Sequence, residues 1–429
     1  MSAGGTGENE PRDEARAGAL TQAEGRVARA LREMGQSSWL VSVLAVVLAL
    51  IAGGVLILAA NREVQATLGY FFARPVDFFA VSWQVLTDAY SALFRGAVFD
   101  WQAPSAVRTI RPITETMVYS VPLILSGLGI AIGFRSGMLN IGGQGQIILG
   151  ASFAGFIGYW MQLPVGLHLL LALLGGALGG AIWGGIAGVL KARTGANEVI
   201  VTIMLNNIAI YLLAWLLQQR WFTQTDSNQP QSAAVAESAQ LFGLLGPQFR
   251  LHAGFILAIL ATLAVWWLME RSTLGFEFRA IGENPEAART AGISVVKATA
   301  LVLIIAGALS GLGGAAHVLG TEHRLTGGIA GTLGFDAITV ALLGRSRPLG
   351  TFLAGLLFGG LKAGGVLMQS QTGTPIDIVL VLQSVIVLLI AAPPLVRAIF
   401  FLPRPGGRPP ASSRRARRQR SAAKKEVAA

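Results

Sequence analysis

Six amide side chains that lie within or beside long apolar stretches of this sequence are candidate hydrogen-bonding groups in an apolar setting. They are Asn140, Gln144, Gln146, Asn206, Asn207 and Gln383. An amide in such a place can hydrogen-bond a ribose hydroxyl or the edge of a base, or it can cap backbone that has left a helix. Both interpretations stay open from the sequence. Because two adjacent amides cannot both face lipid cheaply, we expect Asn206 or Asn207 to face a neighbouring helix.

The first three amides belong to a polar segment, residues 134–146, that also holds four glycines and one arginine. It lies between two apolar runs long enough to be membrane-embedded. Non-helical backbone is tolerated at membrane depth only where it is buried in protein or lines a cavity. The segment is therefore a candidate substrate pathway, and the other three amides are candidates for the same pathway.

A second candidate site lies between two later apolar runs, in the loop 270–297. Asn284 can cap a helix, Pro285 suits its first turn and Glu286 favours the positive end of its dipole. Gly292 would end this helix. The pattern predicts a short surface helix with a small-residue face for docking in a groove. An ordinary capped loop helix without a docking role would have the same pattern. The candidate docking residues are Gly282, Glu283, Asn284, Pro285, Glu286, Ala287 and Ala288.

Other chemistries find little support. The chain has no cysteine and only four histidines, and we find no Asp/Glu/His group with metal-ligand spacing. No nucleophile–base pairing indicates an enzyme, and no cofactor is expected. The sequence lacks the G-x-x-x-x-G-K-[ST] loop, so it should not bind ATP by that route. Asp336, the one acid of a short apolar segment, is expected to cap a helix start or to pair with an arginine.

Composition indicates a membrane protein. The chain has 429 residues, of which 53% are hydrophobic and 13% are charged, against about 25% charged in soluble domains. We expect an all-α polytopic fold with about ten transmembrane helices and two glycine-broken segments. The expected spans are 39–60, 117–134, 147–163, 165–190, 198–218, 251–269, 298–319, 333–343, 350–368 and 376–396.

Loop charges predict the orientation. The net charge of +11 is concentrated after residue 396, where ten bases face one acid. Ten spans and the positive-inside bias then place both termini in the cytoplasm. We divide the chain into a polar cytoplasmic N-terminus (1–38), a permease domain (39–396) and a basic, disordered tail (397–429). Within the permease domain, 61–116 is expected outside, with an interfacial helix at 75–94, and 270–297 inside.

Glycine spacing predicts how the helices pack. Gly176, Gly180, Gly184 and Gly188 recur every fourth residue, which makes a smooth face for a close helix–helix contact. A weak internal symmetry also relates residues 140–150 to residues 331–350. Paired broken segments of this kind indicate a binding site near the midplane of a transporter.

Several motifs resemble one family of permeases. The loop Ile281-Gly-Glu-Asn-Pro-Glu-Ala-Ala-Arg is similar to the coupling helix of ATP-binding-cassette (ABC) importers. Together with Ala337-Ile-Thr-Val-Ala-Leu-Leu-Gly, Ala92-Leu-Phe-Arg-Gly-Ala, Val121-Pro-Leu-Ile-Leu-Ser-Gly-Leu and the segment from Arg135, it resembles the branched-chain amino acid, ribose and nucleoside permeases, the nucleoside branch above all. The resemblance covers roughly residues 40–396. Gln144 departs from it, because relatives often carry an acid there.

The resemblance implies a type II importer-like permease in the plasma membrane of a bacterium. Its partners would be a cytoplasmic ABC ATPase, a second permease subunit that completes a heterodimer, an extracellular substrate-binding lipoprotein of the basic-membrane-protein type, and membrane lipid, with no nucleic acid. Its cargo would be a small neutral nucleoside, moved by alternating access. A ribose or simple-sugar permease is the alternative, and a stand-alone secondary transporter is a third hypothesis, disfavoured because few intramembrane acids or histidines could couple ions.

Overall fold

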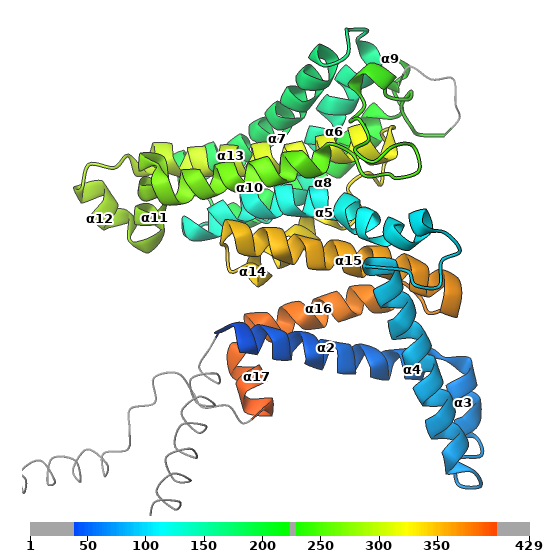
Figure 1. The fold of residues 1–429 in the computed structure, drawn as a ribbon. Helices are drawn as coiled ribbons and strands as arrows, with labels where there is room; N and C mark the ends of the chain where they lie inside the picture. Colours follow the sequence, from blue (N-terminus) through cyan, green and yellow to red (C-terminus); the bar gives the residue numbers. More distant parts are fainter. Residues whose placement is uncertain (1–37, 224–228, 401–429) are drawn as a thin grey trace, which may run out of the picture. The chain divides into compact units, whose positions relative to one another are not determined.

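The computed structural model describes residues 38–223 and 229–400. The expected polar N-terminus (1–38) and basic tail (397–429) fall almost entirely outside these residues. The chain forms two compact units, with residues 51–387 in the larger one. Of the smaller unit, the structure describes only residues 38–50 and 388–400, which belong to helices α2, α16 and α17 (Figure 1).

The described chain is helical, apart from isolated β-bridges such as Gln231 with Thr326. Its elements, in order, are α2 (Ser38–Ala60), α3 (Arg62–Leu68), α4 (Pro75–Ala97), α5 (Ala106–Arg135), α6 (Gly143–Trp160), α7 (Leu167–Thr194), α8 (Glu198–Leu216), α9 (Arg220–Thr223), η1 (Glu237–Ala239), α10 (Gly254–Arg271), α11 (Thr273–Glu283), α12 (Pro285–Thr290), α13 (Val295–His317), the π-helical turn η2 (Val318–Glu322), α14 (Leu333–Leu343), α15 (Pro348–Thr372), α16 (Asp377–Ala391) and α17 (Pro393–Ile399).

Seven of the described helices are long and apolar enough to cross a membrane. They are α2, α5, α7, α8, α10, α13 with η2, and α15. Two more apolar helices, α14 and α16, are shorter. The all-helical, multi-pass architecture expected from composition is therefore confirmed. The ten-span topology and the placement of the termini stay predictions.

The expected spans correspond to helices in the structure, with shifts at their ends, although the span 376–396 is divided between α16 and α17. The span expected from residue 117 is the later part of α5, which begins 11 residues earlier because the Ser105 hydroxyl accepts a hydrogen bond from Arg108 N and caps it. The helix expected over 75–94 is α4, which begins at Pro75, and its place at the membrane interface stays a prediction. The short segment 333–343 is α14, with the same bounds.

Close glycine contacts pack α7 against α13. A Cβ on Gly180 would lie 2.1 Å from the carbonyl oxygen of Gly307, and a Cβ on Gly311 would lie 2.3 Å from the carbonyl oxygen of Gly176. Side chains at these positions would push the two backbones apart, which is why the small-residue face is needed. The packing interpretation of the glycine stripe is confirmed.

Helix α5 lies at the centre of the larger unit, because 83% of its most apolar 18-residue stretch is buried, whereas the same share for α8 is 22%. The helices α6 and α14, of 18 and 11 residues, lie toward opposite ends of this unit (Figure 1). α6 lies toward the end that carries α9, and α14 toward the end that carries α11 and α12, which we call the α12 end (Figure 1). Each follows a non-helical segment, so each is a half-helix that begins inside the unit.

Candidate translocation and coupling sites

The break between α5 and α6 covers residues 136–142 and is held by its own amides. The Asn140 side chain is fully buried, and its Oδ1 accepts a hydrogen bond of 2.9 Å from Gly142 N. The amides of Asn140 and Gln146 also bond to each other in both directions, at 3.2 and 3.3 Å. The first bond satisfies a backbone N–H that the break leaves without a helical partner, and the other two hold the two amides in place.

Asn206 of α8 supports the same break from a neighbouring helix. Its Nδ2 donates to the carbonyl oxygen of Ile141 at 2.9 Å, and its Oδ1 accepts from Gly145 N at 2.8 Å. One buried amide thus satisfies backbone groups on both sides of the α6 start. Asn207 is exposed and donates only to Ile203 of its own helix. The expectation that one of the two faces a neighbouring helix is met by Asn206.

Gln144 joins the two broken segments. Its Nε2 donates to the carbonyl oxygen of Gly331 at 2.7 Å, and its Oε1 accepts from Gly334 N at 2.9 Å. Gly334 has no room for a side chain, because a Cβ there would lie 2.3 Å from Gln144 N. The α6 and α14 half-helices therefore meet at their N-terminal ends, a contact that the sequence did not predict.

The buried amides have a clear structural role in this conformation. Asn140, Gln144, Gln146 and Asn206 all bond within the chain. Gln383 of α16 differs, because it is buried and both of its amide atoms lack hydrogen-bond partners among the described residues. Contact of these side chains with a cargo stays a prediction.

An ion pair lies beside the meeting point of the half-helices. Lys362 Nζ of α15 is 3.0 Å from Asp336 Oδ2 of α14, and the Thr332 hydroxyl donates to the same carboxylate at 2.8 Å. From the sequence, Asp336 is expected to pair with an arginine or to cap a helix, whereas in the structure its partner is Lys362. We did not identify Lys362 from the sequence, where it is the one charged residue of an otherwise uncharged run.

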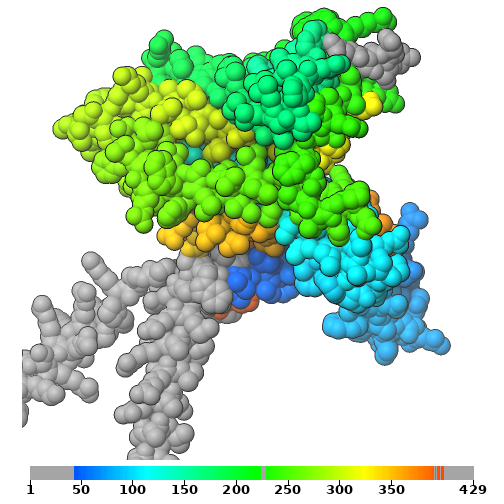
Figure 2. Space-filling view, turned by 45° about the horizontal axis from the view of Figure 1, so that its top comes forward, coloured from blue at the N-terminus to red at the C-terminus, as the bar shows by residue number. Residues whose placement is uncertain are grey.

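The coupling loop forms the two helices α11 and α12. The Asn284 side chain caps α12 by accepting bonds from Glu286 N and Ala287 N at 3.0 and 3.1 Å. Ala288 is buried against the unit, whereas residues 283–287 and 289–292 are exposed. In Figures 1 and 2 this yellow-green segment projects at the left edge of the molecule. The predicted short, capped surface helix is present, and its role in docking stays a prediction.

The base of the coupling loop contacts the start of the broken segment. A Cβ on Gly282 would lie 2.6 Å from the carbonyl oxygen of Arg135, and Gly137, with φ of +70°, would place a Cβ 3.1 Å from the Gly282 backbone. Arg135 also forms an ion pair of 2.6 Å with Glu270 at the end of α10. The loop and the break are therefore joined by a backbone contact and by the Arg135–Glu270 ion pair.

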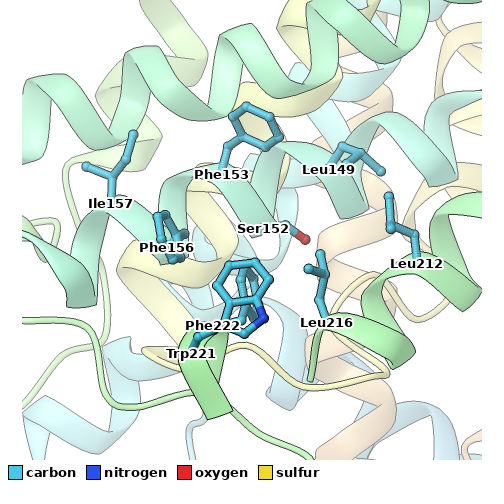
Figure 3. Close-up of a pocket in the computed structure, with 9 residues that line it drawn as sticks. All are labelled: Leu149, Ser152, Phe153, Phe156, Ile157, Leu212, Leu216, Trp221 and Phe222. Atoms are coloured by element: carbon cyan, nitrogen blue, oxygen red, sulfur yellow. The ribbon is translucent and has the colours of Figure 1, made fainter. Parts of the chain in front are cut away.

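A pocket of about 460 Å³ opens between α6, α8 and α9. Its lining is almost wholly apolar, and Figure 3 shows Phe156, Phe222 and Trp221 gathered on one side. The rings of Phe156 and Phe222 stack at 5.4 Å. The Ser152 hydroxyl, its one hydroxyl group, donates to the carbonyl oxygen of Ile148. The pocket thus offers stacking surface with few free polar groups, which suits a nucleoside poorly.

Charged and titratable groups also gather at the end opposite α12. Arg95 Nε lies 2.7 Å from Asp100 Oδ1, and this hydrogen bond holds the pKa of the Asp100 carboxyl below its ordinary value. His252 is buried, and desolvation lowers its pKa to about 4. Its Nδ1 accepts from Gly254 N, so the proton is on Nε2, which lies 3.3 Å from the Thr321 hydroxyl.

Comparison with known proteins agrees with this architecture. The family model described as "Branched-chain amino acid transport system / permease component" matches residues 113–391. A guanosine ABC transporter permease of Bacillus subtilis is 37% identical over 311 residues, covering 71% of this chain and 86% of that protein. A glucose ABC transporter permease of Haloferax volcanii is 33% identical, covering 80% of this chain and 84% of that protein.

A nucleoside ABC transporter permease of Lactococcus lactis subsp. cremoris is also 33% identical, over 66% of this chain and 79% of that protein. No solved structure matches the chain. The permease role assigns ATP hydrolysis to a separate ATPase subunit and implies a substrate-binding protein as a further partner. The chain belongs to the family of branched-chain amino acid transport system permease components and is the multi-pass membrane permease of an ABC importer.

Proposed function

We propose that this permease imports nucleosides across the plasma membrane of a bacterium. Two of the similar permeases are named for guanosine and for nucleosides, and the guanosine permease has 37% identity over 86% of its length. That likeness is the observation that carries the substrate class. A neutral, hydroxyl-rich cargo also fits a helix bundle whose interior polar groups are mostly amides and hydroxyls.

A simple sugar is the second candidate cargo. The glucose permease relative is 33% identical over 354 residues, a longer stretch than the guanosine permease matches. A sugar offers hydroxyl groups but no aromatic base. The two candidates therefore differ in whether the pathway must bind a flat ring, which uptake measurements distinguish directly. The family assignment leaves no place for the stand-alone secondary transporter.

The coupling role is assigned to the helix α12 and its base. We propose that α12, with Glu283 to Ala288, docks in a groove of a cytoplasmic ATPase subunit. Its exposed, capped and partly small-residue surface suits such a groove. ATP-driven closure of the ATPases would move α12, and the Gly282–Gly137 contact would carry that movement to the broken segment. This contact is the observation that supports coupling.

The substrate pathway is proposed beside the junction of α6 and α14. Alternating access would change the junction that Gln144 now closes by bonding Gly331 and Gly334. Asn140, Gln146, Asn206, Asn207 and Gln383 stay candidate pathway residues. A second permease subunit would form the other wall of the pathway, and an extracellular lipoprotein would deliver the cargo. In this arrangement both termini face the cytoplasm.

Uptake in cells tests the substrate class. A strain that lacks this gene should lose uptake of radiolabelled guanosine at sub-micromolar concentration, while uptake of glucose and ribose stays at the parental rate. Restoring the gene on a plasmid should restore guanosine uptake. Loss of glucose or ribose uptake with unchanged guanosine uptake would assign the permease to sugars instead.

A further inference from the structure

The Asp336–Lys362 ion pair is more than α14 needs for its packing. Lys362 lies near the middle of the 25-residue helix α15, and Asp336 lies in the first turn of α14, two residues beyond Gly334. The two helices are already joined at their α12 end, where a Cβ on Gly344 would lie 2.3 Å from Thr351 N. Charged groups inside a membrane protein are costly and are commonly functional.

This ion pair is not sealed inside the protein. The side chains of Asp336 and Lys362 keep 14% and 22% of their exposure. Thr332 is exposed one turn before Asp336, and Phe335, between them in sequence, is 53% exposed. A spacing of three and four residues places Thr332, Phe335 and Asp336 on one face of the α14 start. Facing lipid, these charges would be expensive, so the face must border water or another polypeptide.

The loop that precedes α14 is not packed against other parts of the described chain at two of its glycines. Gly327 and Gly328 are exposed, and a Cβ on either would meet nothing within 4 Å. Gln144 bonds the backbone of Gly331 and Gly334 just before Asp336, which closes the junction between α6 and α14 there.

These groups match the two halves of a nucleoside. The carboxylate can accept hydrogen bonds from both hydroxyls of a ribose cis-diol, and the ammonium can donate to the ring or hydroxyl oxygens. An exposed Phe ring offers a stacking surface for the base. Because the two charges cancel, the site suits a neutral molecule. A carboxylate has about four acceptor positions, so Asp336 can bind a diol while it keeps its bonds to Thr332 and Lys362.

We propose that Thr332, Phe335, Asp336 and Lys362 form the nucleoside subsite of the translocation pathway. In this subsite Asp336 accepts hydrogen bonds from the ribose diol, and Phe335 stacks on the base. This assignment rests on the proposed nucleoside function. The subsite faces away from the core of its own subunit, so cargo would occupy it in the space next to α14 and α15, which are neighbours in Figure 1.

The test compares guanosine with 2′,3′-dideoxyguanosine, which lacks the diol. The complete transporter, with its ATPase, second permease and binding protein, is reconstituted in liposomes, and uptake of both labelled compounds is measured. The binding protein is the same throughout, so a change in the ratio of the two rates arises in the permease. Asp336→Asn should lower the preference for guanosine roughly tenfold, because hydrogen bonds to a charged acceptor are lost.

The matched control is Asp100→Asn, which removes another carboxylate paired with a base, Arg95. It should leave the preference unchanged. The exchanged pair Asp336→Lys with Lys362→Asp would restore a structural ion pair but should not restore the preference. If Asp336→Asn lowers both rates equally and the exchange recovers them, the pair serves packing alone and the subsite is refuted.

A second variant covers the case in which Asp336→Asn fails to reach the membrane. Phe335 is a surface residue, and Phe335→Leu should lower guanosine uptake at low concentration about fivefold through lost stacking. Phe79→Leu on α4, where Phe79 is 64% exposed, should change nothing. Equal uptake by both variants overturns the subsite. If the wild-type transporter takes up no guanosine, the proposed nucleoside function itself fails, which is visible before any variant is compared.

Discussion

Gly282 at the base of the coupling loop lies directly against Gly137 in the turn that begins the broken segment. A Cβ on Gly137 would be 3.1 Å from both the Cα and the carbonyl oxygen of Gly282. Two segments that are far apart in the sequence thus meet backbone to backbone, without flexible side chains between them. A movement of the coupling helix would be transmitted to the break with almost its full amplitude, because close-packed backbone deforms very little.

The first prediction concerns this contact. Gly282→Ala places a Cβ 2.6 Å from the carbonyl oxygen of Arg135, so the loop must shift away from the break. We expect ATP hydrolysis by the assembled transporter to continue while guanosine transport falls at least tenfold, measured on the same liposomes. Gly327→Ala is the control, because its Cβ meets nothing within 4 Å. Transport by Gly282→Ala at the wild-type rate would show that the contact is not needed for coupling.

Charge reversal on α12 tests docking. The Glu286 side chain is 77% exposed and pairs only weakly with Arg289 at 3.1 Å, so Glu286→Arg should not affect folding. It should abolish uptake and weaken ATPase binding in pull-down experiments, while the variant reaches the membrane in normal amounts. Asp88→Arg on α4, another exposed carboxylate, should have no effect on the ATPase interaction. Wild-type uptake by Glu286→Arg would remove α12 from the coupling mechanism.

The adjacent residues Asn206 and Asn207 differ in role, because Asn206 bonds to backbone outside its helix and Asn207 bonds only within its own helix. Asn206→Ala leaves the Ile141 carbonyl and the Gly145 N–H without their buried partner, which should cost about 2–4 kcal/mol of unfolding free energy. Asn207→Ala removes one exposed bond to its own helix and should cost within about 0.5 kcal/mol. Thermal unfolding of the purified permease in detergent measures both. Equal losses of stability would contradict the role given to Asn206.

The buried His252 predicts a pH dependence of stability. Its folded pKa of about 4 lies below the ordinary value of 6.5, so as pH falls through 6.5 the unfolded chain takes up a proton before the folded one. Stability is therefore fully present above pH 6.5 and falls between 6.5 and 4, by about 2 kcal/mol at pH 5. His252→Gln should flatten the difference in thermal stability between pH 7.5 and pH 5.

His323 and Arg250 also affect this pH dependence, because their charges help to lower the pKa of His252. His323 itself has a lowered pKa, so a small slope should persist in His252→Gln. An unchanged slope in that variant would show that another group controls the acid response.

Much of this arrangement follows from the sequence because its causes are local. Apolar length predicts the membrane helices, Asn284 and Pro285 predict the start of α12, and glycines at every fourth position predict the α7–α13 contact. The break after Arg135 can also be predicted locally, because its glycines and amides lie in one short stretch of the sequence. Even the short helix α14 has the bounds that its apolar run indicates.

The long-range contacts could not be predicted in the same way. Gln144 bonds to Gly331 and Gly334, nearly two hundred residues away, and nothing near Gln144 in the sequence indicates those partners. Lys362 is a single charge in an uncharged stretch, and only the fold brings it to Asp336. The same holds for Asn206, whose neighbour Asn207 is chemically identical but points to its own helix.

The most direct test of the account is ATP-driven uptake by the reconstituted transporter. Liposomes that contain this permease, its partner permease and its ATPase, supplied with the binding protein, should accumulate labelled guanosine against a gradient only when ATP is present. They should not accumulate glucose, and Glu286→Arg should abolish the guanosine signal. Accumulation of glucose without guanosine, or guanosine uptake that needs no ATP, would contradict the account.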